Sequence, residues 1–394
     1  MRVLYLTNGF PFPLTSGYLR HYYLIRELSQ WHRITLLSVV GPSFRSEHAE
    51  ALRPYTERVL TFRSAGRGRS RAGKALAWVN AALLGHSPER AMRQAIRQLL
   101  AEERFDAVLF SGKETLTAID GLRTPPVVAD FTDAASLRLR GQIAVSDGFK
   151  RLALHVKLMR VRQLERRILA RAAHSLFASA RDRDAVMGGP QPTVTVVPNG
   201  VDTVYWQRRA PALGERTLVL TGAMNYAPNV DAALHLIRDI LPLVQREVPD
   251  ARALIVGRSP RPALLAEASR PGVTVTGFVD DVRPYLEQAT LFVAPLRFGA
   301  GIQNKLLEAM AMQVPVIASP LAAQGLYTED GAQPPLRVAS TPAGFAETIC
   351  AELRARADDP TPDAEARRFV MAHFDWAVSA RRVHQALQKV AGNS

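Results

Sequence analysis

The segment Arg297–Ser319, RFGAGIQNKLLEAMAMQVPVIAS, constrains the fold of this 394-residue chain more than any other stretch. Two glycines, Gly299 and Gly301, mark a turn that leads into residues with apolar positions at helical spacing. The helical pattern stops before Val314–Ala318, a short apolar run of β-type residues, and another such run, Leu291–Ala294, precedes the segment. This order predicts a strand–loop–helix–strand unit of the kind that builds parallel sheets.

Polar groups gather near the predicted start of that helix, where Lys305 lies one turn before Glu308. A helix N-terminus has unpaired N–H groups and the positive end of the helix dipole, so it attracts phosphate. Glycines let the backbone approach that phosphate closely. A carboxylate one turn deeper can accept hydrogen bonds from sugar hydroxyls. Phosphate together with sugar hydroxyls describes a nucleotide-sugar, which is the ligand that we predict here.

Strand and helix patterns alternate along both halves of the chain. A helix is expected at Tyr18–Ser29, and strands are expected at Val3–Thr7, Ile34–Val39, Ala107–Phe110, Val127–Asp130, Leu218–Thr221, Ala253–Val256, Val273–Thr276 and Leu291–Ala294. This alternation predicts an α/β protein with two doubly wound, Rossmann-like domains facing a central cleft. Gly189–Asp202 is rich in Gly, Pro and extended-type residues, so it is expected to connect domain 1–190 to domain 200–375.

Composition limits the setting in which the chain works. One cysteine, Cys350, excludes a disulfide framework and fits a reducing cytosol; we expect it to be a small buried helix residue. The N-terminal residues MRVLYLTNGF predict a first strand rather than a signal peptide, and no window reaches the ~20 apolar residues of a membrane span. The net charge of +14 leaves open nucleic acid, anionic lipid, phosphorylated substrates or a solvated basic surface.

Four motifs in order resemble the retaining glycosyltransferases of the two-Rossmann-domain (GT-B) type, family 4. That family carries an acid-x7-acid pattern before a segment of the form EAMAxGxPVIA; here Glu308 is the second acid, and Ala300 stands where the first would be. The other motifs are VPNGVD from Val197, TGAMNYAPN from Thr221 and TGFVDDV from Thr276. The variant GIQNKxLEAMAM is similar to sugar transferases associated with exosortase-linked exopolysaccharide loci.

The resemblance implies a retaining hexosyltransferase that moves a sugar from a nucleoside-diphosphate sugar to a lipid-linked or polysaccharide acceptor. It implies no cofactor, no metal and no nucleic acid, a cytoplasmic location peripheral to the inner membrane face, and a helix over 376–394 that packs on the N-terminal domain. Three rivals remain. One is a nucleotide-sugar epimerase, and another is an inactive scaffold, because the first acid and the usual Arg/Lys pair near Ala223 are missing. The third is a nucleic-acid binder, which only the net charge suggests and no recognition motif supports.

The resemblance also assigns donor-binding positions, some facing the phosphates and others cradling the nucleoside. They are Gly17, Gly222, Asn225, Arg258, Phe278, Val279, Gly301, Ile302, Gln303, Asn304 and Glu308. Because Ala223 replaces a base, the phosphates would be held by Lys305, Arg297 or Arg258, or by backbone N–H groups alone, and we choose Lys305. The alternatives are a plain turn at Gly17, structural loops, and an exposed helix lysine at 305.

Two acids, Asp130 and Asp133, end a predicted strand in VVADFTD. Relatives carry a His-Asp pair near this point, so we predict catalytic roles for both acids, binding hydroxyls or aligning the acceptor. A metal site and a helix cap by Asp133 remain open.

Two basic segments stand apart from these motifs. Arg63–Lys74 contains GxG, but we expect no strand to lead into it, and we interpret it as a loop. Lys150–Arg171 carries eight Lys or Arg and one Glu, with an apolar stripe at Leu154, Leu158, Val161, Leu164 and Ile168. It predicts either a helix on an anionic membrane surface or a core-packed helix with a solvated face.

Overall fold

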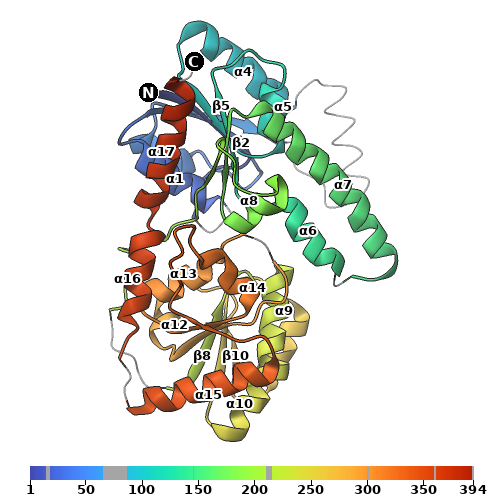
Figure 1. The fold of residues 1–394 in the computed structure, drawn as a ribbon, viewed down its shortest axis with the longest axis vertical. Helices are drawn as coiled ribbons and strands as arrows, with labels where there is room; N and C mark the ends of the chain where they lie inside the picture. The colour runs from blue at the N-terminus through green and yellow to red at the C-terminus, as the bar shows by residue number, and fades with distance from the viewer. Residues whose placement is uncertain are drawn as a thin grey trace. The chain divides into compact units, whose positions relative to one another are not determined.

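The computed structural model describes residues 1–14, 18–64, 87–144, 146–209, 215–299, 301–358 and 361–392. The chain forms two compact units (Figure 1). Unit 1 comprises Met1–Ala178, Asp182–Pro198 and Ser379–Ser394, and unit 2 comprises Ser179–Arg181 and Asn199–Val378. None of the helices in the described ranges is both long and apolar enough to cross a membrane.

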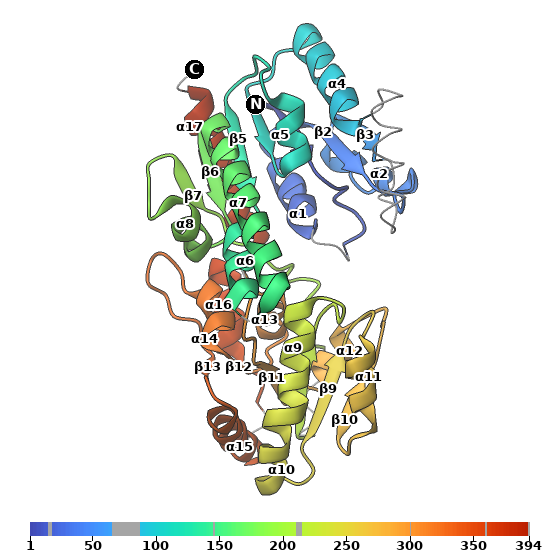
Figure 2. The same ribbon diagram turned by 90° about the vertical axis from the view of Figure 1, so that its right-hand side faces the viewer.

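Unit 1 is built on a seven-stranded parallel sheet in the order β3-β2-β1-β4-β5-β6-β7 (Figure 2). Its strands are β1 (Arg2–Thr7), β2 (Arg33–Val40), β3 (Arg58–Arg63), β4 (Ala107–Phe110), β5 (Val127–Phe131), β6 (His174–Phe177) and β7 (Val194–Val196). Buried residues run almost continuously through β1, β2, β4 and β5, as expected for a parallel sheet covered on both faces.

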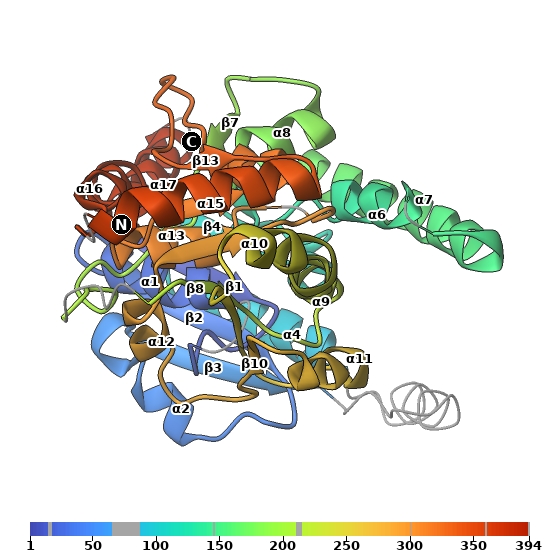
Figure 3. The ribbon, with the colours of Figure 1, turned by 90° about the horizontal axis from the view of Figure 1, so that it is seen from below.

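The helices of unit 1 connect these strands. They are α1 (Leu19–Leu28), α2 (Glu47–Glu50), η1 (Arg53–Tyr55), α4 (Pro88–Glu102), α5 (Lys113–Ile119), α6 (Ala135–Ala144), α7 (Gly148–Arg171), α8 (Ala180–Met187) and most of α17 (Trp376–Gly392). Pro88 at the start of α4 and the Ser87 hydroxyl, which accepts a hydrogen bond from the Arg90 N–H, fix where that helix begins. Helices α6 and α7 form a hairpin that extends from the sheet of unit 1 (Figures 1 and 3).

Unit 2 has a six-stranded parallel sheet in the order β10-β9-β8-β11-β12-β13. Its strands are β8 (Thr217–Thr221), β9 (Arg252–Val256), β10 (Val273–Val275), β11 (Leu291–Ala294), β12 (Val316–Ala318) and β13 (Arg337–Val338). Its helices are α9 (Ala227–His235), η2 (Leu236–Ile240), α10 (Leu241–Glu247), α11 (Pro262–Leu265), η3 (Ala266–Ser269), α12 (Arg283–Glu287), α13 (Asn304–Ala311), α14 (Pro320–Ala323), η4 (Gln324–Leu326), α15 (Pro342–Asp358) and α16 (Ala364–His373).

The prediction of two doubly wound, Rossmann-like domains is confirmed, since each sheet follows the strand order of doubly wound folds. Every strand expected from the sequence is present within a residue or two, and Cys350 is buried on α15. The sequence reasoning missed β3, β6, β7 and β13. These strands are short or only partly buried, so their apolar patterns are weak. The expectation that no strand leads into Arg63–Lys74 is wrong, because β3 ends at Arg63.

In each sheet the strand order reverses at one point, between β1 and β4 in unit 1 and between β8 and β11 in unit 2. The loops that leave the carboxyl ends of such a strand pair diverge to opposite faces of the sheet. Ligands of doubly wound sheets bind in the crevice that this divergence leaves. The sheet topology therefore marks the loops after β8 and β11 as the place to look for a site in unit 2.

Candidate functional site

Backbone hydrogen bonds join the loop after β8 to the end of β9 and the loop that follows it. The Gly222 N–H donates to the Val256 carbonyl (3.0 Å), and the Met224 N–H donates to the Arg258 carbonyl (2.9 Å). Gly222 has φ of +149°, and a Cβ at this position would lie 2.6 Å from Nδ2 of Asn229. A glycine is therefore required both by the backbone conformation and by the side chain that lies against it.

Lys305 reaches this loop from α13, which follows β11. Its Nζ donates a hydrogen bond to Oδ1 of Asn229, on α9, and lies 3.5 Å from where a Cβ of residue 222 would be. The side chain is 8% exposed, so the alternative of an exposed helix lysine is wrong. Burial lowers the pKa of Lys305 to about 8, and the nearby Glu308 carboxylate opposes that shift.

Glu308 lies one turn further along α13, and its side chain is half-buried. Loss of solvation raises the pKa of this carboxyl to about 7, and the positive charge of Lys305 acts in the opposite direction. Near neutral pH the pair can therefore gain or lose a proton readily. Together with the glycine loop at the switch point, these perturbed groups mark the place as a candidate ligand site.

The turn before α13 is held by its own packing. Gly301 has φ of +71°, Ile302 is buried in the unit 2 core, and a Cβ on Gly325 would lie 3.3 Å from the Ile302 Cα. The Oδ1 of Asn304 accepts a hydrogen bond from Nδ2 of Asn199 (3.0 Å). These contacts fix the direction of the N-terminal turn of α13, which is the end that attracts anions.

The remaining predicted donor residues lie on loops at the carboxyl edge of the same sheet. Asn225 and Arg258 are exposed, and the Asn225 carbonyl accepts a hydrogen bond from Arg261 (3.0 Å). Phe278 is 66% exposed after β10, whereas the neighbouring Val279 packs against the core. An exposed aromatic ring on such a loop is able to stack on a nucleobase.

Arg297, which the sequence offered as an alternative phosphate cation, already has a partner. Its guanidinium makes a two-point contact with the Asp231 carboxylate, with N–O distances of 2.8 and 2.5 Å, and this pairing raises the pKa of Arg297. The predicted positions Gly17 and Ala300 lie outside the described residues, as do residues 65–74 of the basic segment Arg63–Lys74.

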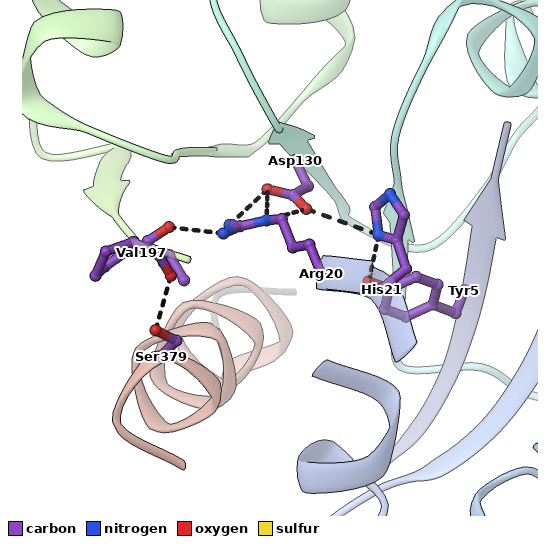
Figure 4. A network of polar contacts seen from close by, with 7 residues as sticks. Tyr5, Arg20, His21, Asp130, Val197 and Ser379 are labelled. Carbon is purple, nitrogen blue, oxygen red and sulfur yellow. Dashed lines mark hydrogen bonds and ion pairs between the residues drawn. The ribbon is translucent and has the colours of Figure 1, made fainter. Parts of the chain in front are cut away.

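A second polar cluster lies within unit 1 around Asp130, at the end of β5 (Figure 4). Arg20 of α1 donates from Nε to Oδ2 (2.9 Å) and from Nη2 to Oδ1 (2.9 Å) of this carboxylate, and from Nη1 to the Val197 carbonyl (2.9 Å). Both charged side chains are at most 5% exposed. Asp130 therefore lies in a buried, fully paired arrangement, and its predicted contact with substrate stays a prediction.

His21 and Tyr5 extend this cluster (Figure 4). Tyr5 Oη and His21 Nδ1 share a hydrogen bond of 3.0 Å, and His21 Nδ1 lies 4.0 Å from Oδ2 of Asp130. Burial lowers the pKa of His21 to about 4 although Asp130 opposes the shift, so the ring is neutral at physiological pH. Burial also raises the pKa of Tyr5 well above its ordinary value.

Asp133 does not cap α6. It instead pairs with Arg138 on that helix, with 3.0 Å between Arg138 Nε and Asp133 Oδ2. The N–H groups at the start of the helix donate to distant carboxylates, Ala134 to Asp182 (3.1 Å) and Ser136 to Glu165 (3.0 Å). Asp133 remains partly exposed, so its predicted role is neither supported nor excluded by its contacts.

Sequence reasoning missed Asn229, the partner of Lys305, and it missed Arg20, His21 and Tyr5 around Asp130. Asn229 lies within the motif TGAMNYAPN, but the motif assigned it no role. The available signal was its position, because Asn229 is a polar residue near the start of the helix that follows the Gly222 loop. Nothing in the local sequence of α1 distinguishes its buried Arg20 from an ordinary helix arginine.

Both units together have the fold of GT-B glycosyltransferase structures. HepE of Anabaena, solved in complex with UDP and glucose, superposes with a TM-score of 0.65 at 14% identity and covers 99% of this chain and 100% of its own. Sucrose-phosphate synthase of Thermosynechococcus elongatus superposes with a TM-score of 0.71 at 14% identity, covering 100% of both chains.

Sequence comparison points to the same class. The family model described as Glycosyl transferases group 1 matches residues 215–354, within unit 2. Phosphatidyl-myo-inositol mannosyltransferase of Mycobacterium tuberculosis is 28% identical over 259 residues, which are 62% of this chain and 66% of that relative. The matched region of the family model includes Gly222, Asn229, Lys305 and Glu308, the four residues of the candidate site.

Proposed function

We propose that this protein is a glycosyltransferase that uses a nucleoside-diphosphate sugar, with the donor bound by the loops after β8 and β11. One observation carries the proposal. Lys305 and Asn229 meet at Gly222 at the switch point of unit 2, with Glu308 one turn beyond Lys305 and electrostatically coupled to it, inside the region that the Glycosyl transferases group 1 model matches.

The chemistry of glycosyl transfer suits these groups. As the glycosidic bond breaks, negative charge develops on the leaving diphosphate, and a fixed cation and oriented N–H groups stabilise it. Lys305 is protonated below its pKa of about 8, so it can supply the cation that is missing at Ala223. Glu308 would accept hydrogen bonds from the donor's ribose hydroxyls. No protein nucleophile is needed if the reaction retains configuration with the leaving phosphate accepting the acceptor's proton.

For the acceptor we propose a lipid-linked or polysaccharide glycan, with a hexose as the transferred sugar. The name of the mycobacterial relative supports a lipid acceptor, because it describes mannosyl transfer to phosphatidyl-myo-inositol. The proposed setting is exopolysaccharide or cell-surface glycan synthesis at the cytoplasmic face of the membrane. The GIQNKxLEAMAM motif supports the exopolysaccharide role by resemblance alone.

The second candidate is an inactive scaffold, favoured by Ala223 in place of a base. Incubation with a panel of nucleotide-sugars and a membrane extract, followed by detection of released nucleoside diphosphate, separates the two. We expect release with at least one donor. A scaffold would bind nucleotide without releasing diphosphate from any donor in the panel.

Variants locate the activity. Lys305→Ala should lower turnover more than donor affinity, because the charge that it stabilises grows in the transition state. Glu308→Ala should weaken nucleotide affinity while the protein stays folded. Arg354→Ala is the matched control, since it removes an exposed base from α15 of the same unit. If Lys305→Ala leaves turnover unchanged, or if the control loses as much activity, the assignment is wrong.

A further inference from the structure

The first half of α7 exposes a stripe of large apolar side chains. Phe149 is 85% exposed, Leu152 62%, Val156 40% and Met159 64%. At 3.6 residues per turn these four positions fall within an arc of roughly 80° on one face of the helix. They form a continuous patch rather than scattered surface residues, and such patches mark interaction sites. We call this set the α7 outer stripe.

The outer stripe is distinct from the apolar stripe found in the sequence, which lies on the opposite side of the helix. Leu158 is buried against Leu139 and Ile143 of α6, and Leu154 and Val161 pack around them. Further along α7, Ile168 joins the main core of unit 1. The helix is therefore already held by one apolar face, and folding of unit 1 does not explain the second.

Cations border the outer stripe on both sides. Arg160 and Lys157 lie about 20° and 80° beyond one edge, Arg162 and Arg151 lie about 60° and 80° beyond the other, and all four are exposed. None of the four forms an ion pair with any residue that the structure describes. The hairpin's ion pairs, Arg138–Asp133 and Arg167–Asp120, form at its other end, near the sheet.

An apolar stripe bordered by unpaired cations has the chemistry of a helix that lies in a membrane interface. Apolar side chains enter the boundary between headgroups and acyl chains, and the flanking bases contact anionic headgroups. A second copy of the same face would bring its like charges together, which disfavours self-association through it. The hairpin also extends from the sheet of unit 1 (Figures 1 and 3), and the four side chains of the outer stripe are 40–85% exposed.

We infer that the α7 outer stripe and its flanking cations dock this protein on an anionic lipid surface, with Phe149, Leu152, Val156 and Met159 entering the interface. The inference is independent of the donor chemistry proposed for unit 2, because it uses no residue of that unit. It differs from purely electrostatic attraction by requiring insertion of specific apolar side chains.

Flotation of the full-length protein with phosphatidylglycerol vesicles and with phosphatidylcholine vesicles tests the inference. Wild-type protein should bind the anionic vesicles, and Phe149→Ser/Leu152→Ser should weaken binding at least about tenfold. Neutralising three cations in Arg151→Gln/Lys157→Gln/Arg160→Gln should weaken it about 100-fold, at about fivefold per charge. Binding should also fall from 0.1 to 1 M salt, as the Debye length falls from ~10 to ~3 Å.

Matched controls use α4 and the loop after it, in the same unit. Arg90→Gln/Arg97→Gln/Arg104→Gln removes three exposed cations and should leave vesicle binding nearly unchanged. Nucleotide affinity should be the same in all variants, so failure of docking is distinguishable from failure of the donor site. If the control triple variant loses as much vesicle binding as the α7 triple variant, binding depends on net charge alone and the inference is overturned.

Insertion itself can be detected directly. The sole native cysteine, Cys350, is 1% exposed, so a Phe149→Cys variant can be labelled at residue 149 with an environment-sensitive dye. The dye should shift to the blue with anionic vesicles, whereas a dye on Arg104→Cys should not. Absence of a shift at 149, or self-association without vesicles that Phe149→Ser/Leu152→Ser abolishes, would overturn the inference.

Discussion

Replacing Lys305 by methionine should stabilise unit 2 at neutral pH while it removes donor turnover. Burial lowers the pKa of Lys305 from 10.5 to about 8, so the proton is held more weakly in the folded protein than in the unfolded chain. Below pH 8 Lys305 is protonated in both the folded and the unfolded state. The folded state then bears the full free-energy cost of burying the ammonium charge. A difference of about 2.5 pH units, at ~1.36 kcal/mol each, corresponds to ~3 kcal/mol.

Part of the stability that Lys305→Met gains by removing the buried charge is offset. Methionine leaves Oδ1 of Asn229 without its donor, and an unsatisfied buried acceptor costs ~1–3 kcal/mol. The expected net stabilisation is therefore ~1 kcal/mol, or ~2–4 °C in the melting temperature. The pH dependence is the sharper signature. Between pH 8 and 10.5 the unfolded state binds more protons, so wild-type stability should rise by ~1.4 kcal/mol per pH unit from this group.

Guanidinium unfolding between pH 7 and 10.5, followed by tryptophan fluorescence, measures this contribution. Trp206 and Trp376 report on unit 2. Subtracting the Lys305→Met profile from the wild-type profile cancels the other titrating groups. Lys113→Met, which removes an exposed lysine at the start of α5 in unit 1, is the control. If the wild-type and Lys305→Met profiles run parallel through this range, burying the Lys305 ammonium does not carry a free-energy cost of this size.

Three further predictions concern the same two clusters. The pKa of Glu308 is raised to about 7 in the folded protein, so its contribution to stability is full below pH 4.5 and is lost as pH rises through 7. Glu308→Gln should remove this fall in the free energy of unfolding between pH 4.5 and 7 in the same assay. Gly222→Ala should cost ~1–3 kcal/mol, because φ is +149° and the new Cβ meets Asn229, and calorimetry should show weaker nucleotide binding. Asp130→Ala should lower the stability of unit 1 by ~3–5 kcal/mol, measured by thermal unfolding, because it leaves Arg20 buried without its carboxylate; a loss below ~1 kcal/mol would contradict this interpretation.

The order of elements was predictable because parallel strands buried on both faces appear in a sequence as short apolar runs between helical patterns. Leu291–Ala294 and Ala107–Phe110 coincide with β11 and β4 for this reason. The spacing of Lys305 and Glu308 on one helix was also readable, because residues three apart face the same side. The weak edge strand β13 was not predictable, since its two residues are exposed.

Only the tertiary structure decided what these residues do. Lys305 meets Asn229, 76 positions earlier, and Asp130 meets Arg20, 110 positions earlier, because strand order brings distant loops together. The pKa of each group depends on the solvent excluded by those neighbours, which no local pattern encodes. Helix α7 carries apolar residues on two faces, and periodicity alone cannot tell which one packs; α6 covers one of them and leaves the outer stripe exposed.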